Sequence, residues 1–379
     1  MSEWKQYKFS DFVDINPSVK IPKGIPIPFV EMKDLNNSIR YCESSQEKEL
    51  SGGSRFMNGD TLFARITPCL ENGKICQVRN LKNGYGFGST EFHVFRGKDG
   101  VSDTDFVYYL SRWDEVRDFA EHNLEGSSGR QRVSKEAFDN LYLTLPPLDT
   151  QCRIASILTS LDDKIDLLRR ENATLEAMAE TLFRQWFVVE AKEEWEEGKL
   201  GDEFVFTMGQ SPSGDSFNED GIGVPMYQGN ADFGFRFPSK RVFTIQPTRF
   251  AEPNDTLISV RAPVGAQNMA TEKCCIGRGV AAFRYKDNSS YYSYTYYKLK
   301  SLLEEIKQFN DNGTVFGSIS KADFENLDIV IPDKETILGF QQQVKVIDDK
   351  IMNNNNEIQT LIQTRDGLLP KLMSNEINI

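Results

Sequence analysis

Apolar side chains recur alternately four and three residues apart over two long stretches of this chain, residues 154–186 and 340–372. This spacing keeps one apolar side chain per turn on the same face of an α-helix, as at the a and d positions of a coiled coil. The pattern therefore predicts two long helices that pack against each other. The first seam consists of Ile154, Leu158, Leu161, Ile165, Leu168, Asn172, Leu175, Ala179, Leu182 and Trp186, and the second of Phe340, Val344, Ile347, Ile351, Asn354, Ile358, Leu361, Arg365, Leu368 and Leu372.

The two seams belong to a repeat that covers most of the chain. The motif Asp162-Asp163-Lys164-Ile165 returns as Asp348-Asp349-Lys350-Ile351, an offset of 186 residues (348 − 162). Further upstream, Asp60-Thr61-Leu62 corresponds to Asp255-Thr256-Leu257 with a different offset of 195 (255 − 60). A constant offset over the helices and a drifting one upstream indicate a fixed frame with variable domains. The period is far longer than that of solenoid repeats, so we interpret it as a duplicated module.

The order of domains and helices predicts how the helices pair. The second helix can meet the first along its whole seam only by running back, so the pair should be antiparallel. A helix of about 39 residues is roughly 58 Å long, which corresponds to about 17 base pairs of duplex. Asp149 and Asp333 are the predicted N-caps. Asn172 and Asn354 in the seam are expected to fix its register, although local solvation of the helices explains them almost as well.

The segments between the helices predict α+β domains of mixed strands and helices. Alternation of Leu141, Leu143 and Leu145 with polar neighbours is typical of a half-buried strand. We expect globular domains over residues 1–148 and 190–332, each followed by its helix over residues 149–189 and 333–379. The predicted strands are Thr61–Ile66, Glu91–Arg96, Leu141–Leu145, Leu257–Arg261, Ala281–Tyr285 and Leu327–Ile331, and the predicted amphipathic helices are Asp105–Glu121 and Tyr294–Phe309.

Composition narrows the class of protein. With 379 residues and 39% hydrophobic content, the chain is long enough for two or three domains with real cores. No signal-peptide pattern occurs over residues 1–16, and no apolar run is long enough to cross a bilayer, so we expect a cytoplasmic protein. The net charge of −12 disfavours non-specific nucleic-acid binding. Basic residues nevertheless gather in loops such as Arg130-Gln131-Arg132, which permits local contacts with DNA.

Three segments closely resemble the specificity subunits of type I restriction-modification enzymes. They are the stretch from Asp60 to Lys74, the segment Leu182-Phe183-Arg184-Gln185-Trp186-Phe187, and the tail Leu368-Leu369-Pro370-Lys371-Leu372-Met373-Ser374. The likeness covers nearly the whole chain, and the phrase Ser259-Val260-Arg261-Ala262-Pro263-Val264-Gly265 in the second copy also fits. One departure is Asn375, where the family's tail usually continues with Gly.

This resemblance implies a non-catalytic subunit that directs the chemistry of others. It implies two target recognition domains that read a bipartite double-stranded DNA target through the major groove, with an unread gap set by the antiparallel helices. Two methyltransferase subunits would bring S-adenosylmethionine and methylate adenine at N6. Two motor-nuclease subunits, where present, would add restriction that depends on ATP and Mg. The partner contacts are expected along the helices, at Trp186, Phe187 and Leu369, although such residues on a seam are more often core.

The candidate DNA contacts are polar and basic side chains in Gly- and Asn-rich loops. Arg, Lys, Asn and Gln are the side chains that reach phosphates and base edges. The same loops also contain the residues that turns require, which explains any single loop equally well. The candidates are Arg65, Asn72, Lys74, Arg130 and Arg132 in the first domain, and Gln228, Asn230, Lys240, Arg261 and Arg278 in the second.

Two other classes of function remain as alternatives. An independent DNA-modifying enzyme would need an Asn/Asp-Pro-Pro-aromatic motif, whereas Pro146-Pro147-Leu148 is preceded by Leu145. Gly84 to Gly88 lacks the spacing of a nucleotide loop, and the two histidines, His93 and His122, suit neither a metal site nor a catalytic triad. A coiled-coil adaptor that does not read DNA would explain the helices but not two elaborate domains. Because the loops of the two copies differ, we expect an asymmetric target.

Overall fold

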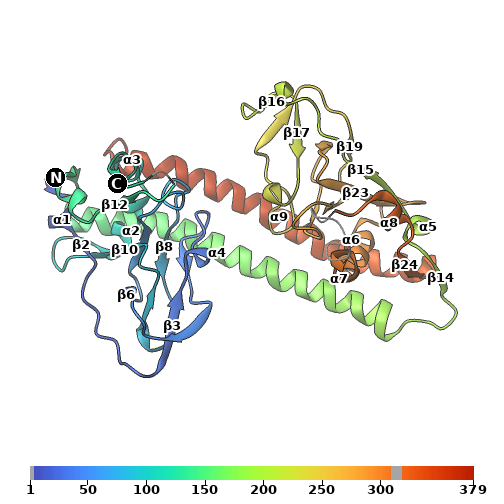
Figure 1. The fold of residues 1–379 in the computed structure, drawn as a ribbon, viewed down its shortest axis with the longest axis horizontal. Helices are drawn as coiled ribbons and strands as arrows, with labels where there is room; N and C mark the ends of the chain where they lie inside the picture. Colours follow the sequence, from blue (N-terminus) through green and yellow to red (C-terminus); the bar gives the residue numbers. More distant parts are fainter. Residues whose placement is uncertain (1–3, 128, 309–317) are drawn as a thin grey trace. The chain divides into compact units, whose positions relative to one another are not determined.

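The protein consists of two compact units. The computed structural model describes residues 4–127, 129–308 and 318–379. Unit 1 comprises residues 1–170 and 354–379, and unit 2 comprises residues 171–353. Each unit therefore combines one globular domain with parts of both long helices, α4 (Leu148–Arg184) and α9 (Lys334–Met373) (Figure 1). The division of the chain into four consecutive segments remains a prediction.

Among the described residues, the globular part of unit 1 contains two sheets of more than two strands. The larger sheet has the strand order β2-β10-β7-β8-β4, and helix α2 (Thr104–Arg112) packs against its three central strands. The second sheet has the order β5-β3-β9-β6, in which β3 and β9 are parallel. These strands are β2 (Val13–Ile15), β3 (Pro26–Val30), β4 (Tyr41–Cys42), β5 (Gln46–Glu49), β6 (Ser54–Met57), β7 (Thr61–Ala64), β8 (Ile75–Val78), β9 (Tyr85–Gly88) and β10 (Phe92–Gly97).

Unit 2 repeats this plan, so the sequence repeat is also a repeat of topology. Its first sheet, β15-β23-β20-β21, corresponds strand for strand to β2-β10-β7-β8. Its second sheet has the order β16-β18-β17-β22-β19, and its parallel pair, β17 and β22, has antiparallel neighbours as β3 and β9 do. The strands are β15 (Phe204–Met208), β16 (Phe217–Asn218), β17 (Val224–Tyr227), β18 (Val242–Thr244), β19 (Phe250–Ala251), β20 (Thr256–Ser259), β21 (Gln267–Met269), β22 (Cys274–Ile276) and β23 (Val280–Tyr285).

A two-stranded antiparallel ribbon closes each domain where it joins its long helix. In unit 1, β1 (Lys5–Lys8) pairs with β13 (Tyr142–Leu145), and in unit 2, β14 (Glu196–Lys199) pairs with β24 (Asp328–Ile331). Entry to and exit from each domain therefore lie side by side. All six predicted strands are present, with ends that differ by no more than two residues from the expected bounds.

Within each unit the segments of α4 and α9 run antiparallel, as predicted. In unit 1, Asp162 pairs with Arg365 while Lys164 pairs with Glu357, so the partner's number falls as the number on α4 rises. In unit 2, Glu171 of α4 lies near Lys350, and the ring of Phe183 lies 5.6 Å from that of Phe340. Every predicted seam residue of both helices is buried or partly buried, so the seam prediction is confirmed.

Two local predictions about helices were wrong. The helix expected over residues 105–121 is broken at Trp113, whose extended backbone (φ −66°, ψ 137°) separates α2 from α3 (Asp114–His122). The helix expected at residues 294–309 begins earlier, as α6 (Tyr292–Ser301), and is followed by α7 (Leu303–Gln308); Phe309 lies outside the described residues. The apolar spacing continues across each break, because α2 and α3 contribute to one core and α6 and α7 contribute to another.

The two predicted N-caps have different outcomes. Asp333 precedes α9 and accepts a hydrogen bond from the Thr336 amide (2.9 Å), so this cap is confirmed. Asp149 lies inside the first turn of α4, which begins at Leu148, and was wrong as a cap. Its carboxylate instead pairs with Arg153. Helix α4 ends in a π-helical turn (Gln185–Val189), and none of the described helices is long and apolar enough to span a membrane.

Candidate nucleic-acid interface

The candidate residues of unit 1 lie around the point where β7 ends. The chain after β7 forms an isolated antiparallel bridge between Ile66 and Arg132. Thr67 donates its amide to the Gln131 carbonyl (3.0 Å), and its hydroxyl oxygen accepts from the Gln131 amide (3.0 Å). These bonds bring the loop after Ile66 next to the loop that contains Arg130.

Arg132 is held by an ion pair within this loop cluster. Its guanidinium donates to both carboxylate oxygens of Glu91, at 2.8 and 2.7 Å. These hydrogen bonds lower the pKa of the Glu91 carboxyl. Arg65 lies beside the same residue, because its amide donates to the Glu91 carbonyl (3.0 Å). The Arg65 Nε is buried and has no hydrogen-bond partner in the described chain. Two donors of the Arg132 guanidinium are therefore already occupied by the Glu91 carboxylate, and this bidentate pair holds the Arg132 side chain in one orientation.

The other three candidates of unit 1 differ in how accessible their side chains are. Lys74 is partly buried and donates to the Met32 carbonyl (2.9 Å). Asn72 is exposed, and its carbonyl accepts a hydrogen bond from Asn37. Arg130 is exposed, and its side chain makes no hydrogen bond or ion pair with any described residue. Arg130 and Asn72 therefore have the side chains best placed to meet a ligand.

In unit 2, Arg261 stands at the equivalent of the first unit's bridge. The bridge joins Arg261 to Ser318, and 318 − 132 gives the repeat's offset of 186. Ser318 is thus the counterpart of Arg132, and Arg261 is the counterpart of Ile66 on the opposite side of the bridge. Arg261 is exposed, and among the described residues none accepts a bond from its side chain.

Gln228 and Arg278 lie close to this bridge. The amide of Val260 donates to the Gly279 carbonyl (2.9 Å), which places Arg278 beside the strand that leads to Arg261. A Cβ at Gly279 would lie 2.1 Å from the carbonyl oxygen of Gln228, so only glycine permits this close approach. Gln228, Arg261 and Arg278 are all exposed and form one polar cluster.

The last two candidates of unit 2 lie on the segment around the short helix η6 (Asn230–Asp232). Asn230 is exposed at its start. Lys240 is exposed but forms an ion pair with Glu272, and its neighbour Ser239 donates its amide to the Asp232 carbonyl (2.8 Å). Lys240 therefore has to exchange an existing partner before it can contact a phosphate.

Sequence reasoning missed one exposed arginine in unit 1. Arg55 on β6 makes no ion pair with any described residue and lines a polar hollow of about 240 Å³. Its signal in the sequence was the repeat, because Arg55-Phe56 before Asp60-Thr61-Leu62 returns as Arg249-Phe250 before Asp255-Thr256-Leu257. Arg249 is also exposed. The hollow is lined by Asn16, Pro17, Ser18, Val19, Gly53, Ser54, Arg55 and Val94.

The three predicted partner contacts lie mostly inside the units. Phe187 and Leu369 are each 9% exposed and belong to the cores of unit 2 and unit 1. Trp186 is partly buried, and its ring packs against Phe340 with a centroid distance of 6.2 Å. Contact of a partner with Phe187 or Leu369 would require the core to open, so Trp186 has the most remaining surface.

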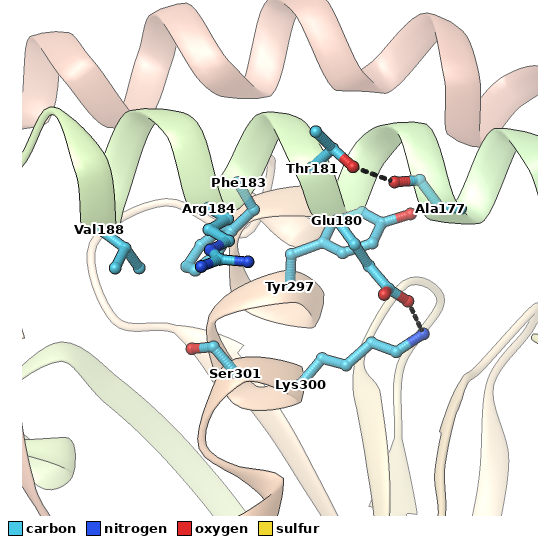
Figure 2. A pocket seen from close by; sticks show the side chains of 9 residues that line it. All are labelled: Ala177, Glu180, Thr181, Phe183, Arg184, Val188, Tyr297, Lys300 and Ser301. Carbon is cyan, nitrogen blue, oxygen red and sulfur yellow. Dashed lines mark hydrogen bonds and ion pairs between the residues drawn. The ribbon is translucent and has the colours of Figure 1, made fainter.

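Beside these residues, unit 2 has a hollow of about 480 Å³ between the end of α4 and α6. Figure 2 shows Glu180 and Lys300 joined by an ion pair on one side and Val188 on the other. Val188 is 61% exposed. The lining residues are Ala177, Glu180, Thr181, Phe183, Arg184, Val188, Tyr297, Lys300 and Ser301.

The described residues contain no group of three or more His, Cys, Asp and Glu side chains that could hold a metal ion. His93 is fully buried, and desolvation lowers its pKa to about 4. Its Nε2 lies 3.0 Å from the Val133 carbonyl, so it supports the β10 region of the fold. The arrangement is one of exposed polar loops on two similar scaffolds.

The family model for the type I restriction modification DNA specificity domain matches residues 1–177 and 192–364. The chain belongs to this family. The protein is therefore a DNA-recognition subunit of the type I restriction-modification class, and its family role is specificity rather than catalysis. The resemblance expected from the sequence is confirmed, and so is its fold class of two mixed α/β domains with two long helices.

Several known proteins are similar over the full length of this specificity subunit. The putative MjaX specificity subunit of Methanocaldococcus jannaschii is 27% identical over 100% of this chain and 94% of its own. The HindI specificity subunit of Haemophilus influenzae is 26% identical over the whole of both chains. Among solved structures, the type I restriction-modification S subunit from M. genitalium superposes with a TM-score of 0.55 at 18% identity, covering 98% of this chain and 96% of that one.

Proposed function

We propose that this subunit reads an asymmetric DNA target in two parts, with one half-site for each globular domain and an unread gap set by the long helices. The observation that carries the proposal is the duplicated domain, since each copy is joined by a two-stranded ribbon to one long helix. The loops of the two copies carry different side chains at equivalent places, such as Ile66 against Arg261. Different loops support different half-sites.

The accessible candidates are proposed to read or hold the DNA. In the first domain these are Asn72 and Arg130, with Arg55 added as a phosphate contact. Arg65, Lys74 and Arg132 are proposed to hold the loops in place. In the second domain the exposed cluster of Gln228, Arg261 and Arg278, together with Asn230, is proposed to reach base edges, and Lys240 to hold phosphate.

The chemistry is proposed to lie with partner subunits. Two methyltransferase subunits would carry S-adenosylmethionine and modify adenine at N6, and motor-nuclease subunits would use ATP and Mg for restriction. A contact near Trp186 would join a methyltransferase to the helices. Since the target is cellular and incoming DNA, the proposal places the complex in the cytoplasm.

The test is long-read methylation mapping of DNA from cells that express this subunit with its methyltransferase partner. Cells that lack only this subunit are the matched control. We expect a split motif with methyladenine in each half that disappears in the control. With both partners confirmed as expressed, the absence of any motif that depends on this chain would favour a coiled-coil adaptor.

A further inference from the structure

Unit 1 has a buried polar chain that ties the recognition domain to both long helices. Arg40, whose side chain is 1% exposed, donates to Gln77 Oε1 of β8 (2.9 Å) and to the Tyr109 hydroxyl of α2 (3.2 Å). Tyr109 in turn donates to Asp162 Oδ2 on α4 (2.6 Å). The other oxygen of Asp162 accepts from Arg365 of α9 (2.7 Å). A continuous set of hydrogen bonds therefore runs from the sheet to both helices.

Arg40 also contacts the helix directly and is charge-balanced. It donates to the Thr159 hydroxyl of α4 and pairs with Asp105. Its guanidinium lies 5.3 Å from the ring centroid of Tyr108 and 5.2 Å from that of Tyr109. An arginine in this setting is fixed in direction by its planar donors as well as by charge.

Unit 2 contains a counterpart built around Arg236, which is also 1% exposed. Arg236 donates to Glu176 of α4 (3.1 Å) and to Asp348 of α9 (2.7 Å). Its guanidinium lies 3.3 Å from the ring centroid of Tyr296 and 5.0 Å from that of Tyr297. This arginine therefore contacts both long helices without an intermediate residue.

The two arginines occupy the same place in the repeated fold. The Arg40 carbonyl accepts from the amide of Gln77 (2.7 Å), and the Arg236 carbonyl accepts from the amide of Met269 (2.9 Å). Gln77 and Met269 are themselves equivalent, because each is the strand partner of the first residue of the neighbouring strand, β7 or β20. The tyrosine pairs are 188 residues apart (296 − 108) and the aspartates 186 (348 − 162). We name these sets anchor 1 (Arg40, Tyr108, Tyr109, Asp162) and anchor 2 (Arg236, Tyr296, Tyr297, Asp348).

Net stability does not explain why a buried ionic site is present in both copies. The free energy needed to remove two charges from water is about as large as the free energy gained from their attraction. A protein with apolar side chains of the same volume in place of a buried ion pair is often as stable as the original or more stable. A buried arginine with several directed bonds does, however, restrict the geometry between the elements it joins. In both anchors those elements are a recognition domain and the long helices.

We propose that anchors 1 and 2 determine the gap between the two half-sites, by fixing the orientation of each recognition domain on the helix segments of its own unit. This inference rests on the proposed function, in which the gap is set by the helical frame. The arginines are positioning residues that do not touch DNA. The base preference of each half-site belongs to the loops, and the anchors determine only which separation of half-sites is accepted.

The test compares two matched pairs of Arg→Lys variants in the complete methyltransferase complex. Arg40→Lys and Arg236→Lys change the anchors. Arg96→Lys and Arg284→Lys are the controls, because these arginines form close ion pairs that stay inside the recognition domains, with Asp60 and Asp255. Methyl transfer is measured on duplexes that carry the wild-type gap or a gap one base pair longer or shorter.

The expected result is that each anchor variant raises the rate ratio of altered to wild-type gap roughly tenfold, the size of losing one hydrogen bond to a charged group. The control variants should leave that ratio unchanged while lowering both rates. An unchanged ratio in the anchor variants, or an equal rise in the controls, overturns the proposal. If Arg40→Lys does not fold, Tyr109→Phe removes the link to Asp162 and is judged by the same ratio. A wild-type complex without any split motif would instead refute the proposed function.

Discussion

Arg130 and Arg132, which begins the short strand β12 (Arg132–Val133), show how the environment of a residue decides its role. Arg132 donates to both oxygens of Glu91, whereas the Arg130 side chain, two residues earlier, has no described partner. A guanidinium that is already paired has to break that pair before it can bind a base or a phosphate. Arg130 is therefore the stronger candidate for reading DNA.

For Arg130→Ala we expect a loss of about 1 to 3 kcal/mol in binding, together with relaxed preference at one base position, if the side chain reads a guanine. The measurement is methylation of a library of targets by the complete complex. Arg153→Ala, which changes an exposed arginine of α4, is the control and should leave every position unchanged. An even loss across all sequences would assign Arg130 to phosphate contact instead.

Glu203 gives unit 2 a defined pH dependence. It is 3% exposed, accepts from the Tyr294 hydroxyl (2.6 Å), and desolvation raises its pKa to about 7. Because the folded-state pKa lies above the unfolded value, the stabilisation is present at low pH and is lost as the pH rises from about 4.5 to about 7. The full change is about 3 kcal/mol in the free energy of unfolding.

We expect Glu203→Gln to remove this dependence, since the amide keeps an acceptor for Tyr294 and cannot ionise. The difference in the free energy of unfolding between variant and wild type, measured by urea denaturation, should grow between pH 5 and pH 7.5 in favour of the variant. Glu219→Gln, at an exposed loop position, is the control. Parallel pH profiles for Glu203→Gln and the wild type would contradict the burial argument.

At the scale of elements, the start of α9 depends on one carboxylate. Asp333 accepts from the Thr336 amide, from Lys192 Nζ (2.7 Å) and from Trp195 Nε1 (2.9 Å). The hydrogen bond from Lys192 is the largest of the effects that hold the Asp333 pKa well below its usual value. Its stabilisation is therefore present at neutral pH and is lost only in acid.

Asp333→Ala should lower the free energy of unfolding by about 1 to 2 kcal/mol at pH 7, because the helix loses its N-cap. Asp149→Ala is a matched comparison, since Asp149 lies within the first turn of α4 and its side chain is 86% exposed. Asp149→Ala should lower the free energy of unfolding by only about a few tenths of a kcal/mol. Equal losses in the two variants, measured by chemical denaturation, would show that the cap at Asp333 adds nothing.

At the scale of the whole molecule, the ribbons lead us to expect that the two recognition domains are exchangeable. Lys8 pairs with Tyr142 and Lys199 pairs with Asp328, so each domain begins and ends at neighbouring backbone positions. A domain joined at such a point can be replaced without a change in the helices that carry it.

A chain in which residues 9–141 also replace residues 200–327 should direct methylation to a target with two identical half-sites. The reason is that the loops determine the half-site and the frame is repeated. Methylation mapping in the same cells as the wild type provides the measurement. Retention of the asymmetric wild-type motif by this chain would place specificity outside the exchanged loops.

Much of the architecture could be predicted from the sequence, because its signals are periodic or repeated. The heptad seams, the six strands and the antiparallel pairing depend on local spacing and on the constant offset of 186 residues. The break at Trp113 could not be predicted this way, because the apolar period of α2 and α3 continues across it. The family could also be predicted from the sequence, because its motifs, such as the stretch from Asp60 to Lys74, are continuous in the chain.

The sequence by itself determined that this chain has two similar domains, two pairing helices and loops rich in DNA-binding residue types. Only the tertiary structure decided which of those residues are available, because their partners are distant in sequence, as Glu91 is from Arg132 and Glu272 from Lys240. It also revealed the anchors. Arg40 and Arg236 lie in segments where insertions shift the offset to 196 (236 − 40), and their burial depends on contacts with helices more than 50 residues away in the chain.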